Sequence, residues 1–314
     1  MSQDFSDESV CDPSRNRPFG DIARTRLSRR TALAGGLATA SAALFSGFGR
    51  AAEQPLLGFK PVPITKGTGP VPSISEDYEY QALIPWGTPL QPDGPEFSYP
   101  PTAADQAQQI GIGHDGMTFF PLDPDNRRNH GMLAINHEFG TNSHVLGKNT
   151  PESLDDVRTS QHAHGVSVVE IKETKNGWET VKSKRSRRIH VNTAVKFSGP
   201  VSGHALLENT AGNAPAGTVN NCSNGQTPWG TYLTCEENFN GYFGSTEAVQ
   251  DQKPIQLEDG YSRYGIGADG WGYDYHKWDE RFDFSKNPNE PHRVGWVVEI
   301  DPTKPESTPV KHTG

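Results

Sequence analysis

The sequence predicts an all-β fold, and within that class a β-propeller, because of three observations. Only 33% of the 314 residues are hydrophobic, while 33 are glycine and 25 are proline. Such a composition is typical of short strands joined by many turns. In addition, several segments alternate apolar and polar residues, and two pairs of these segments resemble each other. A β-sandwich is the alternative architecture.

Four segments carry the clearest strand signal, since their residues alternate and are bounded by Gly, Pro or Asn. These strands are expected at residues 130–139, 165–171, 229–239 and 294–300. A further apolar strand is expected from Met117. Little of the chain has a helical period, so only short helices are expected, within 105–113 and 153–160. The aromatic-rich segment 264–284 is interpreted as a packing loop.

Two pairs of strands look like copies of one unit. "GVSVVEI" and "GWVVEI" each begin with glycine and end in the same four residues. Gly131 and Gly230 each open a strand with a polar end, and they lie 99 residues apart. One propeller blade takes ~40–50 residues, so this spacing corresponds to about two blades. Equivalent strand ends of a propeller converge on its central channel, and the two polar ends are therefore expected to share a site.

The first 52 residues have the layout of an export signal. Arg29 and Arg30 precede an apolar run from Thr31, and the small residues Ala51 and Ala52 follow it. The paired arginines match the twin-arginine type of signal. Because the run is too short and Gly-rich for a membrane span, we expect residues 1–52 to be a signal and 53–314 the folded domain. A short N-terminal anchor is the alternative.

This signal predicts the partners and the location of the protein. We expect the twin-arginine export machinery to recognise it, and the processed protein to be periplasmic or secreted without a stable membrane span. The signal holds seven arginines and five acidic residues, a net +2, so removing it changes the formal charge from −9 to −11. Nucleic acid is not an expected partner, because phosphate contact needs a basic face. Multivalent cations suit such a chain.

Two cysteines remain after the signal, Cys222 and Cys235. In an oxidising compartment they could form one disulfide, or at least one of them could bind a metal. They lie in the segment 220–244, together with adjacent carboxylates and many Asn and Gly residues. Carboxylate and amide oxygens favour calcium, whereas a thiolate favours a softer or redox-active metal. The segment around Cys222 is expected to be a loop that enters the channel mouth.

Polar residues at the two strand ends are the candidate ligands. Alternation places Asn136 and Glu138 on one face of their strand, with His137 pointing away. The same rule places Cys235 and Glu237 on one face of the second strand and Glu236 on the other. His114 and Asp115 stand between glycines, where they form either a metal or phosphate contact on a loop or a plain turn.

Several long motifs carry a resemblance to a known family. They are "IPWGTPL", "HDGMTFFPL", "LAINHEF", "GTVNNCSNGQTPWGTYLTCEENFNGYF" and "PNEPHRVGWVVEIDP". With these motifs the chain resembles the PhoX-type alkaline phosphatases, exported bacterial enzymes, from about Gly58 to its last residue. The resemblance implies a β-propeller, a twin-arginine signal, and hydrolysis of small-molecule phosphate monoesters at a cluster of iron and calcium ions.

The resemblance also ranks the candidate ligands. Cys222 best matches the iron-binding cysteine of the family, with Cys235 as the alternative. Glu237, Glu138 and Asn136 are then candidates for metal or phosphate contacts. The whole candidate metal set is Cys222, Glu237, Glu138, Asn136, Cys235, Glu236, Asp115 and His114. The sequence identifies no attacking nucleophile.

Members of this family are roughly twice as long as 314 residues. The chain therefore resembles the N-terminal half of a member, with an incomplete propeller, and is expected by itself to show little or no phosphatase activity. Two other functions fit a calcium-binding propeller: a binding protein, and a calcium-dependent lactonase or phosphotriesterase. A thiolate ligand separates them from the phosphatase, because a site that binds calcium alone has no use for it.

Overall fold

The computed structural model describes residues 60–62, 69, 71–123, 125, 129–209, 215–247, 249–250, 253–254 and 259–313. The predicted export signal, residues 1–52, lies outside these ranges. The chain divides into two units, Met1–Tyr80 and Gln81–Gly314. In the described part of the first unit, Lys60 forms an ion pair with Glu76, and its backbone N–H donates to Ser75 Oγ over 3.0 Å. The strands and helices with described side chains belong to the second unit.

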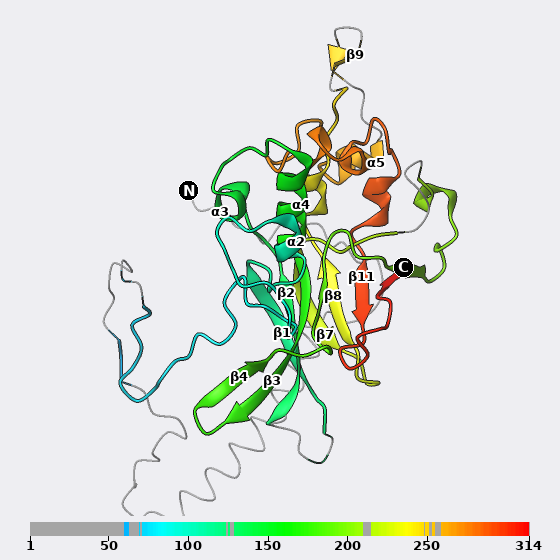
Figure 1. The fold of residues 1–314 in the computed structure, drawn as a ribbon. Coiled ribbons are helices and arrows are strands. Elements are labelled where there is room, and N and C mark those ends of the chain that lie inside the picture. The colour runs from blue at the N-terminus through cyan, green and yellow to red at the C-terminus, as the bar shows by residue number, and fades with distance from the viewer. Residues whose placement is uncertain are drawn as a thin grey trace, which may run out of the picture. The chain divides into compact units, whose positions relative to one another are not determined.

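The first sheet is antiparallel and has the strand order β1-β2-β3-β4, with β5 paired to β3 (Figure 1). Its strands are β1 (His114–Pro121), β2 (His130–His137), β3 (Gly165–Thr174), β4 (Gly177–Val181) and β5 (Arg187–Ile189). Residues 165–171 of β3 are all buried, since β3 lies between β2, β4 and β5.

The second sheet has the order β7-β8-β11-β12-β6. Its strands are β7 (Asn221–Gln226), β8 (Tyr232–Glu236), β11 (Val297–Ile300), β12 (Val310–His312) and β6 (Lys196–Ser198). All neighbours are antiparallel except β12 and β6, which are parallel. A separate two-stranded pair joins β9 (Val249–Gln250) to β10 (Lys253–Pro254).

The two sheets repeat one arrangement. Each contains four strands that lie side by side in the order in which they occur along the chain, β1-β2-β3-β4 in the first sheet and β7-β8-β11-β12 in the second. The predicted copies occupy matching places, because β2 pairs with β3 as β8 pairs with β11. Within the described residues these sheets do not form a closed ring, and the propeller stays a prediction.

Short helices cover one end of the first sheet (Figure 1). The chain contains α2 (Ala103–Gln106), α3 (Asn142–Leu146), α4 (Leu154–Ala163) and α5 (Asp259–Arg263), with 3-10 turns η2 (Ala205–Leu207), η3 (Phe239–Tyr242), η4 (Tyr275–Lys277), η5 (Glu280–Phe282) and η6 (Glu290–Arg293). Ser153 is the N-cap residue of helix α4, and its hydroxyl accepts from the Asp156 N–H. The acidic residues in the first turn stabilise the helix through its dipole. Among the described residues, helices are too short or too polar to cross a bilayer.

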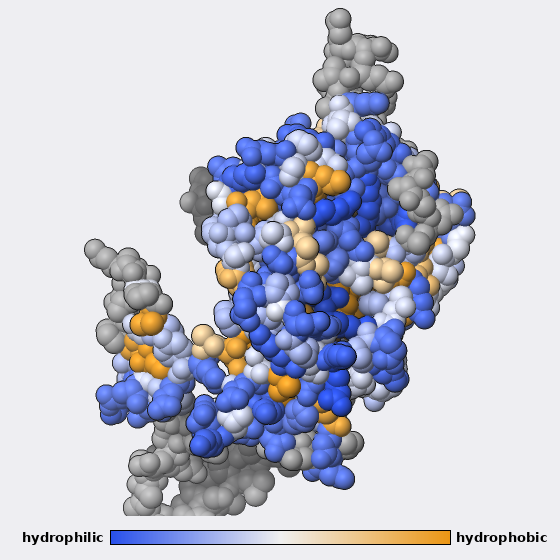
Figure 2. All heavy atoms as spheres, viewed as in Figure 1, coloured by the Kyte–Doolittle hydropathy of each residue, from blue (hydrophilic) through white to orange (hydrophobic). Residues whose placement is uncertain are grey.

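Four apolar clusters of the described residues hold these elements together, and two of them are the largest. One joins the sheets through Phe120, Met132, Val166, Val168, Ile189, Tyr232, Val298 and Ile300. Each such side chain contributes roughly 1.5–3 kcal/mol through burial. The other includes Tyr242, Tyr273, Tyr275, Phe282 and Phe284, so the aromatic segment 264–284 does serve packing. The exterior is different: Figure 2 shows hydrophilic residues over most of the visible face, with hydrophobic residues in small separate areas.

The predicted strands and helices differ from the structure mainly at their ends. The four alternating segments became β2, β3, β8 and β11, with β8 confined to Tyr232–Glu236. Two expected loops are strands. His114 and Asp115 belong to β1, whose register against β2 shifts between His114 and Met117. Cys222 belongs to β7, which forms a hairpin with β8. The Gly and Asn residues in both segments indicated loops. Hydrogen bonds to β2 and β8 nevertheless extend β1 and β7 through these residues.

Candidate metal centre

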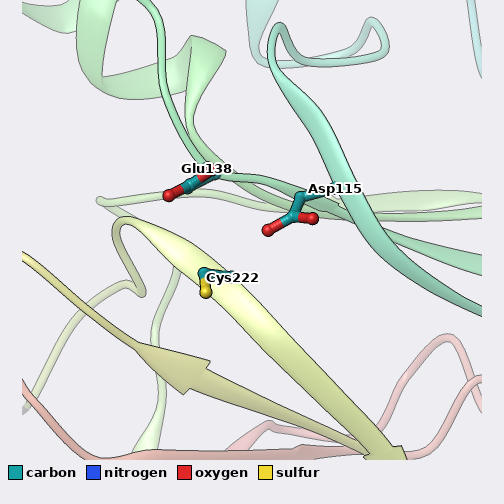
Figure 3. Close-up of side chains that lie close together, drawn as sticks. All are labelled: Asp115, Glu138 and Cys222. Atoms are coloured by element: carbon teal, nitrogen blue, oxygen red, sulfur yellow. The ribbon is translucent and has the colours of Figure 1, made fainter.

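Three residues from three elements bring possible metal-binding atoms together. The side chains are Asp115 on β1, Glu138 just after β2, and Cys222 on β7 (Figure 3). One carboxylate oxygen of each acid and the Cys222 sulfur all lie within 4.8 Å of one another. Asp115 is exposed, while the other two are half-buried. Within the described residues, this is the one group of three His, Cys, Asp or Glu side chains with such spacing.

Close approach of β1 to β7 creates this spacing. A side chain at Gly116 would place its Cβ 2.8 Å from the Cys222 carbonyl oxygen and 2.5 Å from Asn224 Oδ1, so glycine is required there. The Asn224 amide donates to Thr118 Oγ1 over 2.8 Å, and the Tyr232 hydroxyl donates to the Gly116 carbonyl over 3.0 Å. These bonds join the edges of the two sheets, and Asp115 and Cys222 face each other across the junction.

Glu237 lies beside the same group. It follows β8, and its backbone N–H donates to the Asn220 carbonyl over 2.9 Å. A hydrogen bond to the Glu237 carboxylate, and then burial, raise the pKa of the Cys222 thiol above its ordinary value. Burial, and then the charges of Asp115 and Glu237, raise the pKa of Glu138. The centre thus gathers three carboxylates and a thiol that repel one another once ionised, which is a disposition that favours a bound cation.

Cys222 and Cys235 are both free thiols. Of the two alternatives that the sequence left open for them, a disulfide and a metal-binding role, the disulfide is therefore absent from the structure. Cys235 is half-buried on β8, where its register partner is Val297, and it is not one of the three grouped residues.

Asn136 supports the centre from inside the protein. Its amide nitrogen donates to the Cys222 carbonyl over 2.8 Å. Its oxygen accepts from the Tyr232 hydroxyl over 2.8 Å and from the Thr234 hydroxyl over 2.9 Å. As alternation predicts, Asn136 lies on the side of β2 that faces the second sheet. Its polar atoms, however, are used in joining the sheets, and the structure does not group it with the carboxylates.

The two histidines next to the carboxylates point the other way. The rings of His114 and His137 meet edge to face with centroids 4.9 Å apart. His137 Nε2 lies 2.6 Å from Ser167 Oγ, which also accepts from Arg188 over 2.9 Å. His114 Nε2 is 2.8 Å from the Ile84 carbonyl oxygen. The imidazole of His114 is therefore engaged behind β1 and is not placed with Asp115 in the metal group.

Glu236 is engaged in a similar way behind β8. Its Oε1 accepts from Lys311 Nζ over 2.8 Å, and both side chains are fully buried. Its Oε2 accepts from the Trp296 N–H over 3.1 Å. Sequence alternation did separate Glu236 from Glu237. The buried partner on β12, however, lies 75 residues further along the chain, and no local pattern indicates it.

Burial also explains the state of the histidines. Desolvation, and then the charge of the buried Arg188, hold the pKa of His137 well below its ordinary value. Desolvation lowers the pKa of His164 to about 4. Arg188 itself donates to the carbonyls of His162 and His164 at the end of α4, where a cation is favoured by the helix dipole. Arg188 lies in the basic run 182–190, and nothing in the sequence distinguishes it from the exposed basic residues of that run.

A separate cavity lies near the end of β8. Its volume is about 390 Å³, and Phe239, Tyr261, Tyr264 and Trp296 contribute aromatic walls. The residues of the metal group do not line it. Its walls are mostly apolar and also include His204 and His292.

Comparisons with known proteins agree with the resemblance. The sequence profile of the family "Alkaline phosphatase PhoX" matches residues 57–314. A solved structure, "Pseudomonas fluorescens PhoX in complex with vanadate, a transition state analogue", is 43% identical with a TM-score of 0.71. The alignment covers 76% of this chain and 41% of that one, so the chain spans about two fifths of that protein's length. No curated protein matches the chain significantly. Because the family profile covers most of its residues, the chain belongs to the alkaline phosphatase PhoX family.

Proposed function

We propose that the protein is a metal-dependent phosphatase that hydrolyses phosphate monoesters, with Asp115, Glu138, Cys222 and Glu237 as metal ligands. The observation that carries the proposal is the grouping of a thiol and carboxylates within 4.8 Å in a member of this family. Small-molecule phosphoesters are the proposed substrates. We also propose twin-arginine export and a periplasmic or secreted location.

The donor set fits iron together with calcium. Carboxylate oxygens suit calcium, and a thiolate suits a softer or redox-active ion. Burial, and then the neighbouring carboxylates, raise the pKa of Glu138, while a hydrogen bond to Glu237, and then burial, raise the pKa of Cys222. A bound cation would favour the ionised forms of both side chains. When bound, ferric ions would act as Lewis acids on phosphoryl oxygens, and calcium would neutralise charge.

The side chains of the centre then have distinct tasks. The thiolate of Cys222 and the carboxylate of Glu237 bind from the second sheet, while Asp115 and Glu138 bind from the first. Asn136 holds β7 in place through the Cys222 carbonyl. The position of the centre at the junction of two similar sheets supports a further proposal, that these sheets are two neighbouring blades of a propeller.

Elemental analysis of the purified chain is the most direct test. We expect iron and calcium, and loss of iron in Cys222→Ser. Cys235→Ser is the matched control, because that thiol is not grouped with the carboxylates. Calcium without iron would contradict the phosphatase centre and favour the calcium-binding alternatives. Loss of iron in Cys235→Ser alone would contradict the assignment of Cys222.

Vanadate tests the phosphatase proposal itself, since the structure of the Pseudomonas fluorescens protein contains it as a transition-state analogue. We expect the metal-loaded chain to bind vanadate in titration calorimetry, and to lose this binding after chelation. A metal-loaded, folded chain that does not bind vanadate would contradict the proposal. Chelator-sensitive hydrolysis of an aryl phosphate at alkaline pH is the corresponding assay of activity, and robust turnover in it would contradict the expectation that this chain by itself shows little or none.

A further inference from the structure

Asn220 contacts more of the metal centre than any local pattern suggests. Its backbone carbonyl accepts from the Glu237 N–H over 2.9 Å. Its side-chain amide donates to the Glu138 carbonyl over 3.4 Å and to the Tyr242 hydroxyl over 2.9 Å. It also lies two residues before Cys222. One buried residue is therefore linked to three of the four proposed ligands, which come from different strands.

The backbone of Asn220 has an unusual conformation. Its φ angle is +50°, in the left-handed region that side chains other than glycine seldom adopt. Asparagine tolerates this region better than most residues. Residues held in such conformations cluster at functional sites, where the surrounding structure maintains them. Here the conformation leaves the carbonyl bonded to Glu237 while the amide reaches Glu138.

The side chain of Asn220 is not arranged for maximal stability. Asn220 is 3% exposed, and its Oδ1 has no hydrogen-bond partner within the described residues. A buried oxygen without a partner lowers the stability of the folded state. Glycine at this position would adopt the same φ and would leave no such oxygen. What glycine could not provide is the amide N–H pair that contacts Glu138 and Tyr242.

Tyr242 gives that contact a rigid base. Its ring is 1% exposed and stacks on Tyr273 with centroids 4.4 Å apart and an interplanar angle of 23°. The His164 ring meets both tyrosines edge to face. The hydroxyl that accepts from Asn220 is therefore held by a packed aromatic cluster, and its position does not depend on the metal ligands.

We propose that Asn220 is a positioning residue, which sets the spacing of Glu138, Glu237 and Cys222 by tying their backbones to Tyr242. The inference rests on the proposed metal centre, although it concerns a residue outside the ligand set. It assigns the left-handed backbone and the side-chain amide separate effects. The left-handed backbone angle of Asn220 determines the stability of the turn. The side-chain amide determines the spacing of the ligands and therefore the affinity for a cation.

Two substitutions separate these effects. Asn220→Gly keeps the backbone angle and removes the amide, whereas Asn220→Ala loses both. We expect Asn220→Gly to unfold at the wild-type denaturant midpoint after metal removal, but to bind Ca²⁺ about 10–100-fold more weakly, as is typical of residues that orient ligands. Asn220→Ala should lose both stability and affinity. Tyr242→Phe, which removes the hydroxyl that accepts from the Asn220 amide and changes no charge, should repeat the affinity loss if Asn220→Gly does not fold.

Asp274→Gly is the matched control. Asp274 also has a left-handed φ, of +58°, but it forms its ion pair with Lys277 and is not linked to the metal group. This variant should bind Ca²⁺ as the wild type does. Wild-type Ca²⁺ affinity in a folded Asn220→Gly or Tyr242→Phe would overturn the inference. Failure of the wild type itself to bind calcium or iron would instead overturn the proposed function, so the two outcomes are distinguishable.

Discussion

The ends of the two sheets present their acidic residues in the same way but bury different groups behind them. At the end of β2, Glu138 reaches the metal group while its neighbour His137 turns inward. At the end of β8, Glu237 lies beside the group while its neighbour Glu236 turns inward. The buried side chain at the end of β2 is the neutral imidazole of His137, which is hydrogen-bonded to Ser167. The buried side chain at the end of β8 is the carboxylate of Glu236, which forms an ion pair with Lys311.

This difference teaches how adjacent polar residues divide their tasks. A strand points neighbouring side chains to opposite faces, so one residue of each pair belongs to the interior and the other to the site. The interior residue then needs a partner of its own, because a buried polar or charged group without one is costly. Protonation of buried histidines should therefore lower the stability of the first sheet at the end of β2. Removal of a buried charge should lower the stability of the second sheet at the end of β8.

The largest expected effect concerns the second-sheet end. Lys311→Met leaves the Glu236 carboxylate buried without its cation, and such a change costs about 3–5 kcal/mol. Denaturant unfolding of the metal-free protein measures the loss. Lys304→Met is the control, because Lys304 pairs with Asp301 at the surface with 66% of its side chain exposed. Surface pairs contribute about 0–1 kcal/mol.

The double variant Glu236→Gln with Lys311→Met sharpens the same test. Glutamine carries no charge and can still accept the Trp296 N–H, so most of the lost stability should return. If Lys311→Met costs less than about 1 kcal/mol, the buried pair does not hold the end of β8, and the comparison fails on that side.

Acid should act on the first-sheet end. His164 has a folded-state pKa of about 4 against an ordinary 6.5, so the unfolded chain takes up the proton first. The stability linked to His164 is therefore complete above pH 6.5 and is lost as the pH falls toward 4. The loss amounts to about 3 kcal/mol for a shift of this size.

Unfolding free energies of the wild type and His164→Gln at pH 7.5 and 4.5 measure this effect. The wild type should lose more stability than the variant over that interval. His144→Gln, at an exposed position, is the control and should follow the wild type. Parallel losses in wild type and His164→Gln would show that the buried imidazole does not cause the acid sensitivity.

Local patterns predicted much of the fold and only part of the site. Alternation located β2, β3, β8 and β11, and it placed His137 and Glu236 away from their acidic neighbours. It could not assign the inward groups their partners. Lys311 meets Glu236 only because β12, β11 and β8 pair in a particular register. Such a register depends on the whole sheet.

The same limit applies to the ligands. Cys222, Glu138 and Asp115 were all named from the sequence, yet so were Asn136, His114 and Glu236, which the structure uses elsewhere. Residue type and spacing cannot separate these two groups. What separates them is the approach of β1 to β7. This approach depends on Gly116, which packs against Cys222, a residue more than 100 positions further along the chain.

A smaller effect tests that approach. In Gly116→Ala the added Cβ would meet the Cys222 carbonyl, so β1 should move away from β7. Overpacking of this kind costs about 1–3 kcal/mol, and the wider spacing of Asp115 and Cys222 should weaken Ca²⁺ binding. Gly225→Ala on β7 is the control, since no atom lies within 4 Å of its added Cβ. Equal Ca²⁺ affinity in the two variants would contradict the role of the junction.

The smallest effect on the metal-free protein is expected from Glu138→Gln, and its sign is informative. Burial and the neighbouring carboxylates raise the folded-state pKa of Glu138 above 4.5, so its ionised form is disfavoured by folding at neutral pH. Glutamine removes that penalty. Without metal, Glu138→Gln should therefore be as stable as the wild type or slightly more stable, within the roughly 0.5 kcal/mol typical of surface changes.

Added Ca²⁺ should reverse the order of stability of the wild type and Glu138→Gln. At a concentration 100 times its Kd, a ligand stabilises the protein that binds it by about 2.7 kcal/mol, and only the wild type should gain this amount. Unfolding midpoints with and without Ca²⁺ measure both signs. An equal gain in Glu138→Gln would mean that this carboxylate is not a ligand, and that the end of β2 differs from the end of β8 in its outward residue as well as its inward one.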